Sequence, residues 1–227
     1  MDNYLLAPVI DHTALKPETT SAQVETLCRE AHRYGFASVC VMPLWVSLAR
    51  RTLDALASSV VVCTTVGFPN GNHATRSKVT EAALAIAEGA REIDMVMAVG
   101  ALKSGDDAHV LEDIRAVVVE ASRRSALVKV IIETCLLTEE EKRRACAIVG
   151  ESGADYIKTS TGFAGGGATV EDVMLLRRLS PPEVQVKASG GIRDRETALA
   201  MIAAGATRIG TSAGGAIVAV EGTRQTP

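Results

Sequence analysis

SGADYIK, residues 152–158, passes from the glycine that ends an expected helix directly into an expected strand. The same pattern recurs three more times, in YGFASVC (34–40), EGAREID (88–94) and AGATRIG (204–210). Glycine is favoured just after the C-terminal end of a helix, and β-branched apolar residues after it favour a strand. A helix-to-strand unit that repeats along a chain is typical of α/β proteins with a parallel sheet.

The repeats also assign an inner and an outer face to each expected strand. Four residues after the glycine, every repeat carries a β-branched apolar residue: Val39, Ile93, Ile157 and Ile209. Such a residue suits a strand face that is covered by helices, so the next residue is expected to point the other way. The residues expected to point inward are Cys40, Asp94, Lys158 and Gly210.

The whole chain continues this alternation. Strands are expected near residues 8–11, 36–42, 60–66, 91–98, 127–133, 154–159, 184–188 and 207–211. Helices are expected in a segment that ends at Gly35, from Thr138 to Gly153, and over 44–56, 75–88, 107–123, 170–179, 194–204 and 213–219. Eight such units predict an α/β protein, a single (β/α)8 TIM barrel, with an open doubly wound sheet as the alternative. No linker divides residues 1–227, so we expect one domain with a short tail from about residue 220.

A barrel would bring Asp94 and Lys158 together. Barrel interiors are filled by layers of four side chains, each layer drawn from alternate strands. The four repeats supply the second, fourth, sixth and eighth strands. Asp94 and Lys158 are therefore expected in one layer, near the end of the barrel where active sites lie.

Composition and motifs argue against several classes of function. The net charge of −3 gives no sign of a nucleic-acid partner. No apolar run reaches 18 residues and the start has no basic flank, so neither a membrane partner nor a signal peptide is expected. Five cysteines without a CxxC pair favour reduced thiols and a cytoplasmic location. The four histidines lack zinc-site spacing and no nucleotide-binding loop is present, so we expect neither a metal nor a cofactor.

Three lysines occupy strand positions: Lys129, Lys158 and Lys187. Lys158 and Lys187 lie at strand C-termini, directly before small or glycine-rich loops. Two neighbouring buried ammonium groups repel, so one of them loses its proton more easily and becomes an amine that forms Schiff bases with carbonyl compounds. Asp94 adds a carboxylate that moves protons directly or through a water. This set predicts imine-forming carbon chemistry.

A structural interpretation competes with the catalytic one at several positions. A strand lysine is commonly an edge residue or half of an ion pair, and this interpretation is favoured for Lys129. Asp11, His12 and Thr13 are expected to face the mouth of the barrel, with His12 favoured as a hydrogen-bonding support rather than an acid or base. Cys40 is expected to be a small buried residue of the pocket wall.

Glycine-rich loops follow the sixth, seventh and eighth expected strands: TSTGF (159–163), SGGIRD (189–194) and GTSAGG (210–215). Glycine lets backbone N–H groups approach an anion, and the loops after strands 7 and 8 form the common phosphate site of TIM barrels. The alternative is that these loops are ordinary turns. Because no Walker loop or dinucleotide fingerprint is present, a substrate phosphate is favoured over a nucleotide.

Segments that carry these residues resemble, in order, the signature segments of the deoxyribose-phosphate aldolase family: IDHTALKP, VCVMP, VGFPNG, EIDMVMAVGALKSG, VKVIIET, YIKTSTGF, VKASGGIR and RIGTSAG. The resemblance covers nearly the whole chain, although Phe163 stands where some members carry a lysine. It implies that Lys158 is the Schiff-base lysine, that Lys187 perturbs it, and that Asp94 is the proton donor and acceptor. It implies phosphate binding by Gly162, Gly190, Gly191, Arg193, Gly210, Thr211 and Ser212, and the predicted substrate-binding set also contains Thr161, Cys40 and Asp11.

The resemblance implies a class I aldolase that reversibly cleaves 2-deoxy-D-ribose 5-phosphate to acetaldehyde and D-glyceraldehyde 3-phosphate. It also implies a small phosphorylated sugar as the partner, no metal, and a cytoplasmic homo-oligomer, either a dimer or a tetramer. The residues alone leave three alternatives open. These are a different aldol enzyme (transaldolase-like or acting on keto acids), an isomerase of phosphosugars, and a barrel that only binds.

Overall fold

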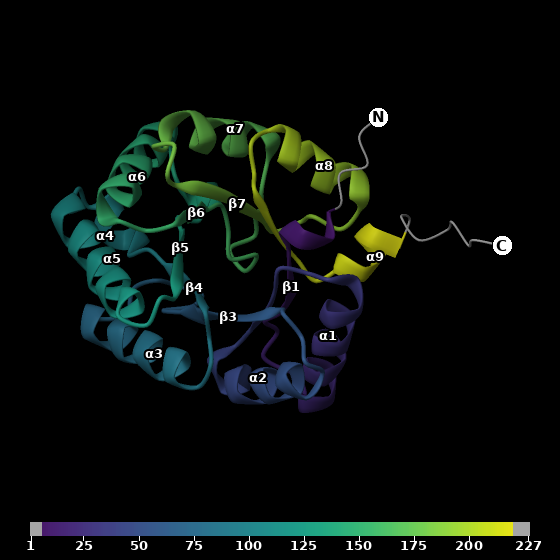
Figure 1. Cartoon of the computed structure of the whole chain (residues 1–227). Coiled ribbons are helices and arrows are strands. Elements are labelled where there is room, and N and C mark those ends of the chain that lie inside the picture. Colours follow the sequence, from purple (N-terminus) through teal and green to yellow (C-terminus); the bar gives the residue numbers. More distant parts are fainter. Residues whose placement is uncertain (1–5, 220–227) are drawn as a thin grey trace.

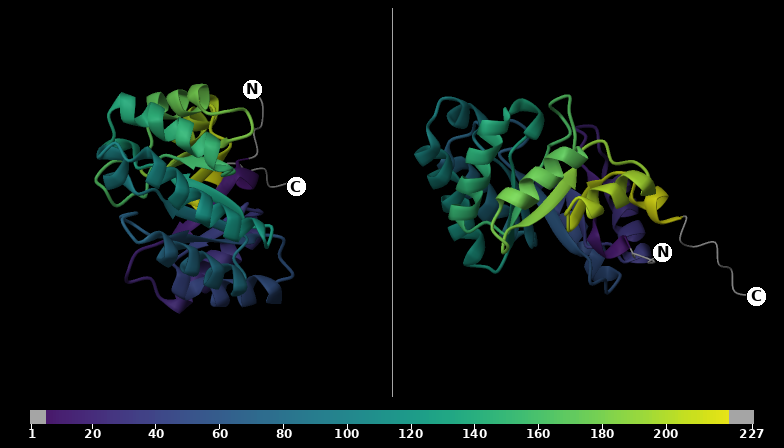
Figure 2. Two further views of the ribbon diagram at one scale, coloured as in Figure 1. Left: turned by 90° about the vertical axis from the view of Figure 1, so that its left-hand side faces the viewer. Right: turned by 90° about the horizontal axis from the view of Figure 1, so that it is seen from above.

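The computed structural model describes residues 6–219, which form a closed barrel of eight parallel strands surrounded by helices (Figure 1). Each strand pairs with its neighbours in chain order, and β8 pairs with β1 to close the sheet. Two further views show the helices arranged around the outside of the strands (Figure 2). The predicted (β/α)8 TIM barrel is confirmed and the open-sheet alternative is wrong. The expected tail from residue 220 lies outside the described residues.

The strands are β1 Ile10–Ala14, β2 Ser38–Val41, β3 Val61–Val66, β4 Glu92–Val96, β5 Leu127–Ile131, β6 Tyr156–Lys158, β7 Gln185–Ser189 and β8 Arg208–Thr211. The α-helices are α1 Ser21–Tyr34, α2 Val46–Ala55, α3 Thr75–Ala87, α4 Val99–Lys103, α5 Asp107–Ser122, α6 Glu139–Ser152, α7 Val170–Leu179, α8 Arg195–Ala203 and α9 Gly214–Ala219. Short 3-10 helices are η1 Ala7–Val9, η2 Pro43–Trp45 and η3 Thr134–Leu136. Among the described helices, none has the length and apolar character needed to cross a bilayer.

Most element boundaries agree with the predictions within a few residues, and three differ informatively. The first strand, predicted over 8–11, begins at Ile10 and continues to Ala14 because it pairs with both β2 and β8. The predicted helix 44–56 begins as the 3-10 turn η2 before α2. Helix α4 was not predicted, since five residues are too few for a helical period to be visible.

Capping residues fix the helix ends that position the strands. Helix α6 begins at a capping box in which Thr138 and Glu141 each bond the other's backbone N–H. Helices α1 and α6 end at Gly35 and Gly153, with φ of +70° and +81°. Glycine adopts this left-handed conformation without a side-chain clash, so the chain can turn sharply there from helix to strand.

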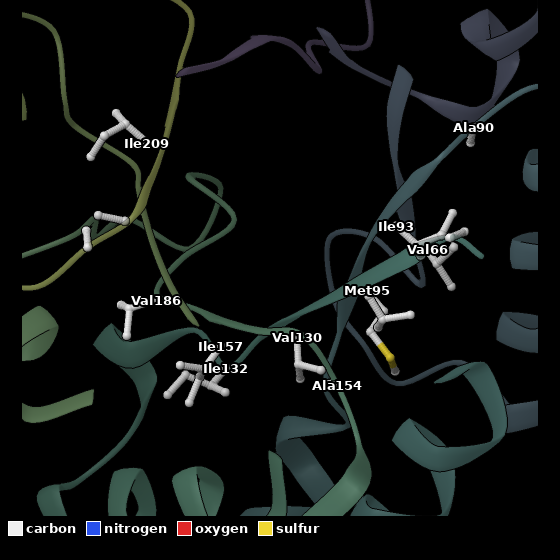
Figure 3. Packing of buried hydrophobic residues seen from close by; sticks show 14 of the residues in the cluster. Val66, Ala90, Ile93, Met95, Val130, Ile132, Ala154, Ile157, Val186 and Ile209 are labelled. Carbon is white, nitrogen blue, oxygen red and sulfur yellow. The ribbon is translucent and has the colours of Figure 1, made fainter. Parts of the chain in front are cut away.

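The β-branched residues of the four repeats lie on the outside of the barrel, as predicted. Val39, Ile93, Ile157 and Ile209 are all fully buried in the cluster between strands and helices. Figure 3 shows Ile157, Val130 and Val186 directed away from the strands toward the surrounding helices. The opposite strand faces must therefore fill the barrel interior.

Those inner faces form layers of four, and the middle layers are charged rather than apolar. The layer from even-numbered strands holds Cys40, Asp94, Lys158 and Gly210. The layer below it, from odd-numbered strands, holds Asp11, Cys63, Lys129 and Lys187. Below that lie Ser38, Glu92, Tyr156 and Arg208. Bulky branched residues usually fill these layers, so charges there indicate a use other than packing.

A buried ion pair also lies outside the barrel, between α3 and α5. Lys78 Nζ donates to Asp113 Oδ2 at 2.6 Å and to the carbonyl oxygen of Val96 at 2.9 Å, and both charged side chains are fully buried. Asp113 Oδ1 accepts from Thr75 Oγ1 at 2.8 Å. The pair thus joins two helices to the C-terminal end of β4.

Breaking this pair from one side is expected to be costly. The variant Lys78→Met leaves the Asp113 carboxylate buried without its cation, so the free energy of unfolding should fall by about 3–5 kcal/mol. The double variant Lys78→Met/Asp113→Leu should lose less than the sum of the two single variants, because no lone charge remains. Urea unfolding of the four proteins measures this, and strict additivity would contradict a direct interaction between the two side chains.

Candidate active site

A cavity of about 740 Å³ opens at the C-terminal ends of β1, β6, β7 and β8. Nine predicted site residues line it: Lys158, Thr161, Gly162, Gly190, Gly191, Arg193, Gly210, Thr211 and Ser212. The other four lie outside its lining, fully buried in the barrel: Asp11, Cys40, Asp94 and Lys187. The predicted residues are therefore one connected site, with a wall that faces the cavity and a charged base within the barrel.

Lys158, the last residue of β6, is the link between base and wall. Its side chain is 4% exposed, whereas those of Lys129 and Lys187 are 0% and 1% exposed. Of these three lysines, Lys158 is the one that lines the cavity. Its Nζ lies 2.7 Å from Asp94 Oδ2, which confirms that the two residues share one layer. A small molecule in the cavity thus meets this amine first.

Asp94 binds all three strand lysines. Its Oδ2 accepts from Lys158 at 2.7 Å and Lys187 at 2.6 Å, and its Oδ1 accepts from Lys129 at 2.9 Å. Burial raises the pKa of Asp94, but the three ammonium charges outweigh burial and hold that pKa well below its usual range. Asp94 therefore remains ionised across the neutral pH range.

Lys187 is held as a cation by two carboxylates. Besides Asp94, its Nζ donates to Asp11 Oδ2 at 2.5 Å. Burial lowers the pKa of Lys187, but Asp11 and Asp94 outweigh burial and raise it above the usual range for a lysine. Since Lys158 and Lys187 contact the same oxygen of Asp94, a fixed positive charge stands beside the Lys158 amine.

Lys129 belongs to the lower part of the cluster, where the structural interpretation is confirmed. It forms ion pairs with Glu92 at 2.6 Å, Asp94 at 2.9 Å and Asp11 at 3.5 Å. Arg208 Nη1 binds Asp11 Oδ1 at 2.7 Å and Glu92 Oε2 at 3.0 Å. These contacts stack the charges from the base of the barrel up to Asp94.

The cluster contains more cations than carboxylates. Within the described residues, four basic side chains (Lys129, Lys158, Lys187 and Arg208) contact three acidic ones (Asp11, Glu92 and Asp94). Lys158 contacts one carboxylate, whereas each of the other three cations contacts two or more. Lys158 is therefore the cation that the carboxylates of the cluster hold by the fewest ion pairs.

Two further residues considered in the sequence, Cys40 and His12, lie near the site. Cys40 is fully buried with its Sγ 4.0 Å from Asp94 Oδ2, so it packs behind the carboxylate. His12 lines the cavity, as expected of a residue at its mouth, and its Nε2 lies 2.8 Å from Glu30 Oε2. This contact is the hydrogen bond expected of a supporting residue. Cys40 and Cys63 also lie near Asp94 in the arrangement of a metal site, but lysine ammonium groups already bind that carboxylate.

The loops after β6, β7 and β8 carry the glycines that the cavity requires. Gly162, Gly190 and Gly191 have φ of +84°, +88° and +81°. Thr211 Oγ1 donates to the carbonyl oxygen of Ile192 at 2.7 Å, which joins the end of β8 to the loop after β7. A Cβ at Gly210 would lie 3.1 Å from Lys187 Cε, so this glycine gives the lysine room to reach Asp94.

Sequence reasoning missed three charged residues of the site. Glu92 and Arg208 lie in the repeats themselves, two residues before the inward positions, and strand alternation would have placed them in the barrel. Glu133 lies two residues after the end of β5. Its carboxylate accepts a hydrogen bond from the backbone N–H of Thr161 at 3.2 Å. No spacing in the sequence links Glu133 to Thr161.

Known proteins resemble this chain over nearly its full length. A deoxyribose-phosphate aldolase 1 of Bacillus licheniformis is 58% identical over 213 residues, which cover 94% of each chain. A solved deoxyribose phosphate aldolase of Aeropyrum pernix, described as a tetramer, is 33% identical with a TM-score of 0.89, covering 96% of this chain and 91% of that one. A solved aldolase named QR15 is 44% identical with a TM-score of 0.89 and 95% coverage of both chains.

The family described as DeoC/LacD family aldolase matches residues 5–219, which includes every residue of the charged cluster and of the cavity wall. The barrel interior is charged, and one lysine of its cluster lines the cavity. A curated relative is more than half identical, so the site and the comparisons agree on the family. The chain belongs to the DeoC/LacD family of aldolases.

Proposed function

We propose that this protein is a class I aldolase that reversibly cleaves 2-deoxy-D-ribose 5-phosphate to acetaldehyde and D-glyceraldehyde 3-phosphate. The observation that carries the proposal is the position of Lys158. It is the one lysine of the charged cluster that lines the cavity, and its carboxylate partner is shared with a second, cationic lysine. The names of relatives, such as the Bacillus licheniformis deoxyribose-phosphate aldolase 1, supply the substrate.

The reaction begins with Lys158 as a neutral amine. The neutral form is required because the attack on a carbonyl carbon uses the free electron pair of the nitrogen. The Lys158 nitrogen attacks the aldehyde carbon of the open-chain sugar, and loss of water gives an iminium ion. The new positive charge is on the Lys158 nitrogen, which lies 2.7 Å from Asp94 Oδ2, so the carboxylate stabilises it.

Bond cleavage follows from the iminium. The C3 hydroxyl loses its proton through a water to Asp94, and the C2–C3 bond breaks as its electrons move toward the iminium nitrogen. D-Glyceraldehyde 3-phosphate leaves, and an enamine stays on Lys158. Because the pKa of Asp94 is held low, its carboxylate does not stay protonated. We therefore assign to Asp94 the transfer of protons through a water. Protonation of the enamine carbon and hydrolysis then release acetaldehyde and restore the amine.

The phosphate is assigned to the loops after β6, β7 and β8. Their glycines line the same cavity as Lys158, together with Arg193 and Ser212. Backbone N–H groups that approach without a side chain, and one guanidinium group, suit a phosphate dianion. This arrangement supports a substrate whose aldehyde reaches Lys158 while its phosphate stays at the loops.

The setting of the enzyme is part of the same proposal. All five cysteines are free thiols, which suits a reducing compartment, and we propose a cytoplasmic location. The Aeropyrum pernix relative is described as a tetramer, and we propose that this chain also acts as a homo-oligomer.

Lys158 is expected to be essential and to be the site of covalent attachment. The variant Lys158→Ala should abolish turnover, because no other lysine of the cluster faces the cavity. Borohydride added with acetaldehyde should fix an ethyl group on Lys158 of the wild-type protein, as read by peptide mapping. Lys129 serves as an internal control, since it lies in the same cluster without lining the cavity. Labelling of another lysine, or of none, would contradict the mechanism.

Lys187 is expected to set the pH at which the imine forms. In Lys187→Met the fixed positive charge beside Lys158 is lost while Asp94 remains, so the pH dependence of imine formation should move to higher pH. Lys187→Arg keeps the charge and should keep most of the wild-type profile. The pH dependence of acetaldehyde trapping measures this shift. An unchanged profile in Lys187→Met would rule out the electrostatic role.

A further inference from the structure

Glu133 has an unusual backbone for a buried acidic residue. Its φ of +55° and ψ of +66° lie in the left-handed region, which costs a non-glycine residue about 1–3 kcal/mol unless its surroundings hold it there. Two other described non-glycine residues, Ala57 and Ser125, have positive φ, but both are exposed in turns that lead into strands. Glu133 is 2% exposed and lies after β5, at the end of the barrel that carries the cavity.

The Glu133 side chain binds one residue of the neighbouring loop, Thr161. Both of its carboxylate oxygens accept from the backbone N–H of Thr161 at 3.2 Å, and Oε2 also accepts from Thr161 Oγ1. Thr161 Oγ1 in turn accepts from the backbone N–H of Phe163 at 3.0 Å. One carboxylate thus fixes the turn Thr161–Phe163, which begins three residues after Lys158.

The loop between β6 and α7 is therefore held from two sides over residues 159–163, which we call the strand-6 loop. On the β7 side, Ser189 Oγ donates to the carbonyl oxygen of Ser160 at 2.6 Å, and the backbone N–H of Ser189 donates to Thr159 Oγ1 at 3.1 Å. On the β5 side, Glu133 binds Thr161. The β7 contacts hold the first half of the loop, and the Glu133 contacts hold the half that carries Gly162.

That second half is a wall between two cavities. Thr161 and Phe163 line both the active-site cavity and a neighbouring cavity of about 440 Å³, and Glu133 lines the neighbouring one. The Phe163 ring packs edge-on against Phe68, with ring centroids 5.2 Å apart. Without its anchor at Glu133, this wall has empty space on each side into which it can move.

We propose that Glu133 is a positioning residue that fixes the strand-6 loop, and with it Gly162, against the substrate phosphate. It acts from behind the wall and touches neither Lys158 nor the cavity that holds the substrate. Its effect is on preference: the enzyme selects phosphorylated over unphosphorylated deoxyribose partly because Glu133 holds the loop in place. This inference rests on the function proposed above and adds a residue that sets its specificity.

The test compares two substrates in matched variants. In Glu133→Leu, which removes every acceptor for Thr161, the KM for 2-deoxy-D-ribose 5-phosphate should rise about tenfold or more, the order expected when hydrogen bonds to a charged group are lost. The kinetics with unphosphorylated 2-deoxy-D-ribose should change far less, so the preference for the phosphorylated sugar falls. Glu133→Gln keeps a carbonyl acceptor and should recover most of that preference.

Two further variants keep the test decisive. Asp155→Asn is the matched control, since Asp155 also accepts a backbone hydrogen bond, from Val128 at 2.8 Å, but at the opposite end of β5. It should leave the substrate preference unchanged. If Glu133→Leu does not fold, Thr161→Val removes the hydroxyl that joins Glu133 to Phe163 and should lower the preference in the same direction.

The outcomes separate this inference from the proposed function. Acetaldehyde trapping on Lys158 should persist in Glu133→Leu, because the charged cluster is intact. Equal losses with both sugars, or an unchanged preference in Glu133→Leu, would overturn the positioning role while wild-type trapping still supports the aldolase. Failure of the wild-type protein to trap acetaldehyde would instead overturn the proposed function itself.

Discussion

The site depends on one oxygen atom, Asp94 Oδ2, that binds two lysines at once. Lys158 and Lys187 lie 2.7 and 2.6 Å from it, so the carboxylate holds the proposed nucleophile and a second lysine side by side inside the barrel. Bringing such charges out of water is unfavourable unless each is paired. The stacked contacts of Lys129, Arg208, Glu92 and Asp11 provide that pairing, and Lys158 has a single carboxylate partner, where the cavity begins.

This arrangement explains why the barrel interior departs from ordinary packing. Apolar branched residues cover the outer faces of the strands, as the core around Ile93 and Ile157 shows, and this outer layer holds helices and strands together. The inner faces are thereby free to carry charge. Gly210 is the fourth residue of the layer and has no side chain. A Cβ there would contact the Lys187 side chain, which extends to Asp94. The apolar layer between strands and helices stabilises the fold, and the charged side chains of the site lie inside the barrel.

The proposed phosphate site differs from the charged base in how the fold holds it. Strand residues carry the charged base, whereas loops carry the residues that we propose bind the phosphate. The strand-6 loop is tied to Ser189 on one side and to Glu133 on the other. Glu133 has a strained backbone, and its carboxylate binds Thr161, through which we propose that it positions this loop.

The sequence by itself determined the eight strand–helix units and the core of the site. Four glycine-ended repeats gave the direction of Asp94 and Lys158, because side-chain direction in a strand follows from counting, whereas the closed strand order came from the structure. It did not determine which of the three strand lysines reaches the cavity, nor that Asp11 and Glu92 complete the cluster, nor that Glu133 holds Thr161. Those facts join residues far apart in the chain, up to 197 positions for Arg208 and Asp11, and only closure of the barrel brings them within hydrogen-bonding distance.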